Sequence, residues 1–159
     1  MDDASMIDLT MSVELADVNA TEALGARIGR ALRAGDLVAL DGPLGSGKTC
    51  LVRGIAHGMG IDGALVTSPS FILMQRYGGG SVGLVHMDAW RMRSEHDLGD
   101  LGFDELLSSR SDVVAVEWPT KVASALPAAR VWITITVTPQ DTRIVRVDDQ
   151  RACGGVRGG

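Results

Sequence analysis

Three hydrophobic patterns along the chain predict its principal β-strands. Leu37–Leu40 and Val113–Val116 are continuous apolar runs, as expected of strands that are buried on both faces. From Val131 to Val137 apolar and polar side chains alternate, which is typical of a strand with one buried face. After a turn at Pro139–Asp141, Ile144–Val147 are expected to return antiparallel to that strand.

Shorter patterns predict the remaining elements. The further strands expected are an edge strand at Met11–Leu15 and a pair, Phe71–Tyr77 and Val82–Met87, joined by the turn Gly78–Gly80. The helices expected are one capped by Asn19 or Thr21 and ending near Arg33, one over Lys48–Gly58, and short ones at Ser94–Asp97 and Phe103–Leu107. This mixture predicts an α/β fold with a partly antiparallel sheet and flanking helices.

Length and composition favour one compact domain. The chain has 159 residues and 16.7 kDa, with 45% hydrophobic and 22% charged residues, which is ordinary globular composition. We expect the domain at residues 11–149, after a loose N-terminal lead-in at residues 1–10. Residues 150–159, rich in glycine and arginine, are expected to form a flexible tail.

Charge and cysteine content narrow the class of protein. A net charge of −5 argues against a domain that grips nucleic-acid phosphates by itself. Two cysteines, Cys50 and Cys153, make no disulfide framework and fit a reducing compartment. No apolar run approaches the roughly 18 residues of a membrane span, and the acidic N-terminus does not resemble a signal peptide. We therefore expect a cytoplasmic protein without a membrane partner.

The clearest chemical signal is a phosphate-binding loop after the first buried strand. The segment Gly42-Pro43-Leu44-Gly45-Ser46-Gly47-Lys48-Thr49 fits the pattern G-x-x-x-x-G-K-[ST], which is expected about 0.004 times by chance in a chain of this composition. Its glycines let backbone N–H groups face phosphate oxygens at a helix N-terminus. Lys48 is expected to reach the β- and γ-phosphates, and the Thr49 hydroxyl to bind Mg²⁺. The expected fold is therefore P-loop NTPase-like.

Two acidic residues at strand ends are candidates for the Mg²⁺ site or its water. Glu117 ends the all-apolar run Val113–Val116, and Asp88 ends the more polar run Leu84–Met87. Because ligands of open α/β sheets bind at the carboxyl ends of the strands, both acids are expected at the same sheet edge, beside the loop. A solvated or capping acid is the alternative for each.

Three other features leave more than one interpretation open. Thr67-Ser68-Pro69-Ser70 is either a γ-phosphate-sensing switch or a plain turn. His86 is a lone strand histidine, for which a packed imidazole is at least as plausible as a catalytic one. Trp118 belongs either to the core or to a surface that covers a nucleotide or partner.

Five motifs together resemble a known family. The motifs are Gly42–Thr49, Thr67–Phe71, His86-x-Asp88-x-Trp90-Arg91, Leu101-Gly102-Phe103 and Glu117-Trp118-Pro119. In this order and spacing they resemble the TsaE (YjeE) family, the small ATPase of bacterial tRNA threonylcarbamoyladenosine biosynthesis. The likeness extends over about Met11–Val147, with Trp90 in place of the usual tyrosine and Ser70 in place of a common threonine.

The resemblance implies a function and a set of site residues. It implies an ATP-binding, slowly hydrolysing subunit that acts through TsaB-like and TsaD-like partners, with tRNA contacted indirectly. Lys48 and its loop would bind phosphates, while Thr49 and Glu117 would hold Mg²⁺. Thr67 would be switch-like, and Asp88 would be needed for activity. Arg143, in the last predicted hairpin, falls near the nucleotide.

Two other functional classes fit a phosphate loop. A P-loop small-molecule kinase usually closes an arginine-bearing lid over the transferred phosphate, and here only Arg91 and Arg93 are candidates, without a visible lid segment. A non-hydrolysing nucleotide sensor would not require both acids and the switch-like segment. A Ras-type GTPase is disfavoured because the chain has no N-K-x-D motif.

Overall fold

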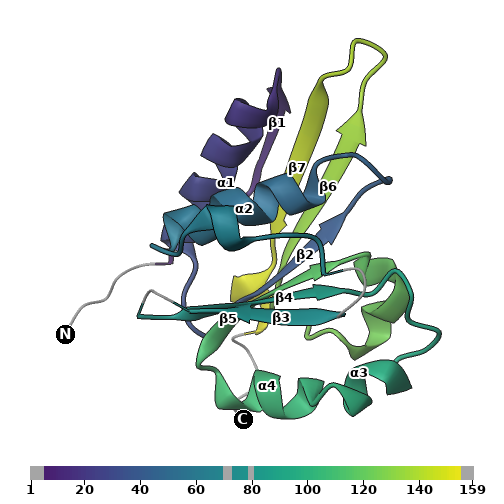
Figure 1. The fold of residues 1–159 in the computed structure, drawn as a ribbon. Coiled ribbons are helices and arrows are strands. Elements are labelled where there is room, and N and C mark those ends of the chain that lie inside the picture. Colours follow the sequence, from purple (N-terminus) through teal and green to yellow (C-terminus); the bar gives the residue numbers. More distant parts are fainter. Residues whose placement is uncertain (1–5, 70–72, 79–80, 155–159) are drawn as a thin grey trace.

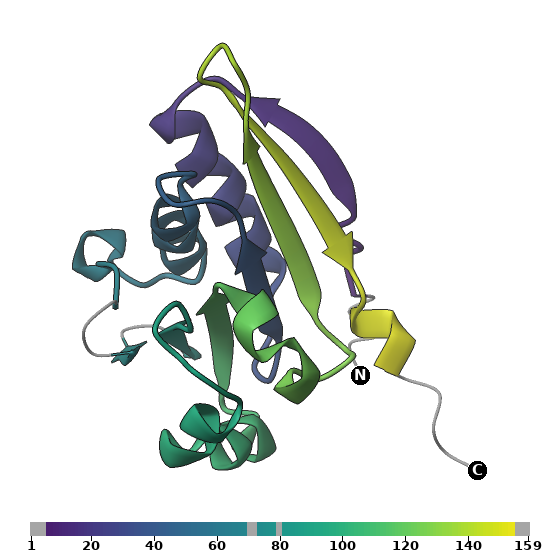
Figure 2. The ribbon, with the colours of Figure 1, turned by 90° about the vertical axis from the view of Figure 1, so that its right-hand side faces the viewer.

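A mixed β-sheet forms the centre of the computed structural model, which describes residues 6–69, 73–78 and 81–154 (Figure 1, and Figure 2 for the view turned by 90°). The described residues make seven strands in the order β1-β7-β6-β2-β5-β4-β3. The four central strands, β6, β2, β5 and β4, are parallel, whereas β7, β1 and β3 pair antiparallel. The prediction of an α/β fold with a partly antiparallel sheet is confirmed.

Most predicted elements are present. The strands are β1 Met11–Leu15, β2 Leu37–Asp41, β3 Met74–Tyr77, β4 Gly83–Asp88, β5 Asp112–Glu117, β6 Val131–Val137 and β7 Arg143–Asp149. The helices are α1 Val18–Ala31, α2 Lys48–Gly58, α3 His96–Asp100 and α4 Phe103–Ser109, with 3₁₀ turns η1 Gly63–Leu65, η2 Pro119–Ala125 and η3 Arg151–Gly154. The predicted strand pair Phe71–Tyr77 and Val82–Met87 is only partly described by the structure. Outside the described residues lie Phe71, at its start, and Gly79 and Gly80 of its turn.

Two layers of side chains bury the faces of the sheet. Helices α1 and α2 cover one face, where Leu24, Ile28 and Leu51 pack against β2 and β5 (Figure 1). Residues from α3, α4 and η2 pack on the other face, with Phe103 fully buried among them. Because β2 and β5 lie between these layers, the apolar runs Leu37–Leu40 and Val113–Val116 within them are explained by burial on both faces. Among the described residues, no helix is both long and apolar enough to span a bilayer.

Helix α1 holds α2 at very short range. A Cβ atom added to Gly54 would lie 2.3 Å from the Glu22 carbonyl oxygen, and one added to Gly29 would lie 2.2 Å from the Ile55 carbonyl oxygen. Any larger side chain at these two positions would push the helices apart. Since α2 begins at the phosphate loop, this close packing also fixes the direction of the loop.

The N-terminal cap of α1 differs from the prediction. Neither Asn19 nor Thr21 is the cap: the helix begins at Val18, and the side chain of its cap, Asp17, accepts a 2.8 Å hydrogen bond from the Ala20 N–H. Aspartate is as good a cap as asparagine, so the residue type alone did not decide between the candidates.

The ends of the domain are packed more firmly than composition indicated. Within the predicted lead-in, Leu9 is buried. Arg151, which was assigned to a flexible tail, is also buried and donates hydrogen bonds to Asp36, Asp149 and the Ile7 carbonyl oxygen. The tail prediction is therefore wrong for Arg151, because a guanidinium with several fixed acceptors loses its freedom. Residues 1–5 and 155–159 lie outside the described part of the chain.

The Arg151–Asp149 pair predicts a pH-dependent stability. Burial alone would raise the pKa of the Asp149 carboxyl, but hydrogen bonds from Arg151 and from the Leu9 N–H hold it below its usual value. A carboxyl with a lowered folded pKa stabilises the fold above its unfolded pKa and loses that effect as pH falls through its folded pKa. Arg151→Met should lower the free energy of unfolding at pH 7 by about 3–5 kcal/mol, because Asp149 is left buried and unpaired.

Urea unfolding at pH 7 and pH 3 measures this effect. The difference between Arg151→Met and the unchanged protein should shrink in acid, where Asp149 becomes protonated. Arg146→Met removes an exposed arginine from β7 and should change stability little at either pH. An equal deficit for Arg151→Met at both pH values would contradict the ion-pair explanation.

Candidate functional site

Parallel strand pairing brings the two candidate acids to one edge of the sheet. Asp88, the last residue of β4, lies opposite Glu117, the last residue of β5. Glu117 also lies opposite Leu40 of β2, one residue before that strand ends. The phosphate loop leaves β2 at this same edge. Both carboxylates therefore lie beside the loop, although both belong to buried strands rather than to a polar surface.

The loop Gly42–Thr49 connects β2 to the first turn of α2. Gly47 caps the helix with a φ of 104°, a left-handed conformation that favours glycine. At Gly42 a Cβ atom would lie 2.7 Å from the Ser46 hydroxyl and 2.8 Å from the Ile135 carbonyl oxygen, so no side chain fits there. The loop thus leads directly into the N-terminus of α2, which is a suitable site for an anion.

Lys48 is a buried cation held by its own loop. Its ammonium group donates hydrogen bonds to the carbonyl oxygens of Gly42 (2.6 Å) and Pro43 (3.0 Å), and only 5% of the residue is exposed. Burial lowers the pKa of Lys48, and the carboxylates of Glu117 and Asp88 oppose that shift. Anionic oxygens would bind this ammonium group more strongly than neutral carbonyls do, so Lys48 is prepared to exchange one for the other.

Glu117 is connected to the loop by a direct hydrogen bond. The Thr49 hydroxyl donates to Glu117 Oε1 at 2.8 Å, and the His86 ring nitrogen Nε2 lies 3.1 Å from the same oxygen. Hydroxyl and carboxylate oxygens are the ligands that Mg²⁺ prefers. No group of three or more His, Cys, Asp or Glu side chains suited to a metal occurs among the described residues. A Mg²⁺ ion here would therefore rely on Thr49, Glu117 and oxygens from a substrate.

Asp88 occupies a different position from Glu117. It is 4% exposed, and its Oδ1 accepts a 2.8 Å hydrogen bond from the Trp90 N–H. Its own N–H donates to the Leu73 carbonyl oxygen. These contacts direct the carboxylate toward the cavity beside the loop, which Asp88 helps to line.

Two tryptophans stack at the mouth of this cavity. The rings of Trp90 and Trp118 are 4.3 Å apart between centroids and tilted by 46°. The Lys48 ammonium lies 4.0 Å from the centre of the Trp118 ring, within cation–π range. Trp118 is half-buried and has a positive φ of 57°. Trp118 also packs against the core layer that contains Phe103, so it contributes to the core and covers Lys48 of the loop at the same time.

The cavity at this edge has a volume of about 350 Å³. It is lined by Leu44, Gly45, Gly47, Lys48, Thr49, Cys50, Ser68, Asp88, Trp90, Glu117 and Trp118. Thr67, the predicted switch residue, is exposed, and its N–H donates to the Tyr77 hydroxyl at 3.3 Å. Among the described residues of that segment, Ser68 lines the cavity instead. Ser70 lies outside the described residues.

A second hollow of about 370 Å³ lies on the other side of the loop. Arg143, at the start of β7, donates from Nε to the Ser46 carbonyl oxygen at 3.2 Å and from Nη1 to Asp141. Together with Asp17 and Thr21 it lines this hollow. Arg143 therefore lies next to the loop, and its contact with a nucleotide remains a prediction.

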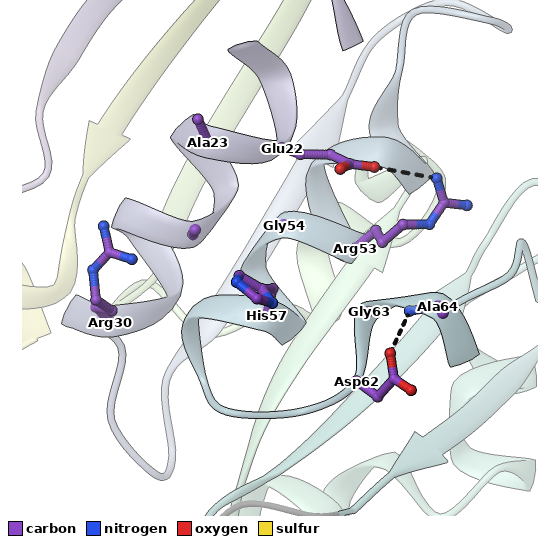
Figure 3. Close-up of a pocket in the computed structure, with 10 residues that line it drawn as sticks. Glu22, Ala23, Arg30, Arg53, Gly54, His57, Asp62, Gly63 and Ala64 are labelled. Atoms are coloured by element: carbon purple, nitrogen blue, oxygen red, sulfur yellow. Dashed lines mark hydrogen bonds and ion pairs between the residues drawn. The ribbon is translucent and has the colours of Figure 1, made fainter. Parts of the chain in front are cut away.

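A groove of about 600 Å³, larger than these two hollows, lies elsewhere, between α1, α2 and η1 (Figure 3). Arg30, Arg53 and His57 face it together with Glu22 and Asp62, and Arg53 forms a 3.5 Å ion pair with Glu22. Its charges are nearly balanced, and the phosphate loop does not line it. The residues expected of a phosphate site therefore line the 350 Å³ cavity beside the loop rather than this groove.

The sequence did not predict the parts of the site that depend on tertiary contacts. It left the role of His86 open, and in the segment Thr67–Ser70 it named Thr67 as the switch residue, whereas the structure places Ser68 at the cavity. The sequence did contain one signal for His86. This residue precedes Asp88 by two positions in a predicted strand, and residues i and i+2 of a strand share one face, so His86 falls on the same face as Asp88. Without the strand register, however, that signal did not identify Glu117 as its partner.

Comparisons with known proteins identify the family of the chain. The family model "Threonylcarbamoyl adenosine biosynthesis protein TsaE" matches residues 15–145. The chain is 40% identical to the tRNA threonylcarbamoyladenosine biosynthesis protein TsaE of Treponema pallidum over 123 residues, which is 77% of this chain and 89% of that protein. The protein of the same name from Streptomyces coelicolor is 42% identical over 75% of this chain and 80% of its own length.

A solved structure shares the fold. The crystal structure of YdiB from Bacillus subtilis superposes with a TM-score of 0.74 and 28% sequence identity, over 92% of this chain and 89% of that one. The resemblance inferred from five short motifs is therefore confirmed over most of the chain. The chain belongs to the TsaE family.

Proposed function

We propose that this protein binds ATP with Mg²⁺ and hydrolyses it slowly, in support of threonylcarbamoyladenosine formation on tRNA. The observation that carries the proposal is the meeting of the buried Lys48 ammonium with the Thr49–Glu117 hydrogen bond at one sheet edge. The names of the relatives supply the pathway. TsaB-like and TsaD-like proteins are the proposed partners, and tRNA would be contacted through them, since the chain itself is acidic.

Each part of the site has a task in this proposal. The loop N–H groups and Lys48 bind the phosphates, and Thr49 and Glu117 hold the metal ion. Mg²⁺ supplies charge neutralisation at the phosphate oxygens when it is bound. The hollow beside Arg143 has a volume of about 370 Å³, borders Gly45–Gly47 and is not lined by Glu117. We propose that it receives the nucleoside end of ATP.

Asp88 and the segment at Thr67–Ser68 are proposed to act in turnover. Asp88 lines the cavity beside the loop, so it is placed to orient water or sense the γ-phosphate. Ser68 lines the same cavity, while Thr67 precedes it on the exposed chain. Phosphate contacts would order this segment and hydrolysis would release it, which would reset the modifying enzyme rather than supply its chemistry.

Reconstitution of tRNA modification tests the pathway. TsaB-like and TsaD-like proteins from the same organism would be supplied with an activated donor of the threonylcarbamoyl group and tRNA, with or without this chain and ATP. Repeated turnover should require this chain and hydrolysable ATP, and modified nucleoside would be measured by mass spectrometry. Equal multiple turnover without the chain would contradict the proposal.

The isolated protein should hydrolyse ATP slowly, and the partner pair should change its rate or its nucleotide affinity. The reason is that the cavity is open, so that a partner is needed to complete and close it. ADP release would be measured with each addition separately. A small-molecule kinase would instead be stimulated by a metabolite and leave phosphate on it.

Lys48→Ala should weaken ATP binding by roughly 10- to 100-fold, because charge-assisted hydrogen bonds to the phosphates are lost. Lys121→Ala is the matched control: it removes the same charge from the edge of the site, over Trp90 rather than over the loop. It should bind ATP nearly as well as the unchanged protein. Calorimetry with ATP and Mg²⁺ decides, and equal affinities for all three proteins would refute the loop's role.

Glu117→Gln and Asp88→Asn should separate metal binding from turnover. Glu117→Gln should raise the Mg²⁺ concentration needed for nucleotide binding about tenfold or more, since an anionic ligand becomes neutral. Asp88→Asn should reduce the hydrolysis rate more than the affinity. A Mg²⁺ titration of binding, paired with single-turnover hydrolysis, distinguishes them. The opposite pattern would exchange the two roles.

A further inference from the structure

His86 is a buried polar residue that the proposed site does not yet use. It has no exposed surface, and it lies on β4 beside Ala115 of β5. Glu117 is two residues further along β5, so the two side chains are diagonal neighbours on the same face of the sheet. This placement explains the 3.1 Å separation between His86 Nε2 and Glu117 Oε1.

The hydrogen bonds to Glu117 are distributed unevenly between its two oxygens. Both donors, the Thr49 hydroxyl and the His86 ring, approach Oε1. No hydrogen bond from the described residues reaches Oε2. An ionised carboxylate only accepts, so the His86 hydrogen must be on Nε2 for the contact to be favourable. Oε1 is thus occupied by protein donors, and Oε2 is available to the cavity that Glu117 lines.

Packing alone does not account for a histidine at this position. With the hydrogen on Nε2, the other nitrogen, Nδ1, is a buried acceptor that has no partner among the described residues. Such a group costs stability, and an apolar side chain would avoid the cost. The neighbouring buried residues of the same face, Leu84 and Ala115, are apolar. The contact with Glu117 is the benefit that offsets the unpaired Nδ1.

We propose that His86 is a positioning residue that holds the Glu117 carboxylate ready for Mg²⁺. This role of His86 rests on the proposed function, since it concerns the same metal site. By donating to Oε1, His86 fixes the rotamer of Glu117 and directs Oε2 to the cavity. Thr49 keeps its own contact to Oε1 through its hydrogen, which leaves lone pairs of the hydroxyl oxygen available for a metal ion.

Three variants test this role by nucleotide binding rather than by activity. His86→Leu removes the donor and keeps a buried side chain, whereas His86→Gln offers an amide N–H donor of similar reach. His57→Leu is the control, because His57 is exposed on α2 and lines the separate groove in Figure 3. Binding of a non-hydrolysable ATP analogue would be titrated with MgCl₂, and also measured in EDTA.

His86→Leu should need roughly 10- to 100-fold more Mg²⁺ for half-maximal binding, the usual effect of losing a hydrogen-bonded support behind a metal ligand. Its binding in EDTA and its thermal stability should match those of the unchanged protein. His86→Gln should recover most of the Mg²⁺ affinity, and His57→Leu should change nothing. An unchanged Mg²⁺ requirement in His86→Leu, or equal losses with and without Mg²⁺, would overturn the positioning role.

Two results separate this inference from the function on which it rests. If the unchanged protein binds the nucleotide with no Mg²⁺ dependence, the proposed function and this role both fail. If nucleotide binding depends on Mg²⁺ but the His86 variants do not change that dependence, only the positioning role fails. In addition, ¹⁵N chemical shifts of the His86 ring in the protein alone must show the hydrogen on Nε2; a ring protonated on Nδ1 alone would contradict the contact.

Discussion

The parallel pairing of β2, β5 and β4 is the constraint on which the site depends. It sets Glu117 opposite both Leu40 and Asp88, so that the phosphate loop and two carboxylates meet at one edge. A shift of one residue in the register of β5 would turn Glu117 to the opposite face, toward α3 and α4. The apolar layers on both sides of β5 exclude such a shift, because its alternate residues fill two different cores.

Electrostatics explains how a buried cation is tolerated at that edge. Lys48 has left water, which lowers its pKa, but it is paired with two loop carbonyl oxygens and lies near acidic side chains. Trp118 covers it with the face of an aromatic ring. None of these partners is as favourable as a phosphate, so the arrangement sacrifices stability for binding. His86 shows the same exchange of stability for binding, because its buried Nδ1 has no partner among the described residues while its Nε2 contacts Glu117.

The sequence predicted elements whose signals are local. The bounds of β1, α2 and β6 follow from alternation or from the loop motif itself, and the structure confirms them. Features that depend on distant partners were not predictable: Arg151 finds its acceptors in Asp36 and Asp149, and no local pattern shows that. For the same reason, the motifs identified the loop and the acids but not the contact of His86 with Glu117, which requires the register of two strands.

A structure of the protein with a non-hydrolysable ATP analogue and Mg²⁺ is the most direct test of this account. It should show the Lys48 ammonium moved from the Gly42 and Pro43 carbonyl oxygens to phosphate oxygens, with the metal ion next to Thr49 and Glu117. The nucleoside should lie in the hollow beside Arg143. A nucleotide bound instead in the groove between α1 and α2, with Lys48 still on its loop carbonyls, would contradict the account.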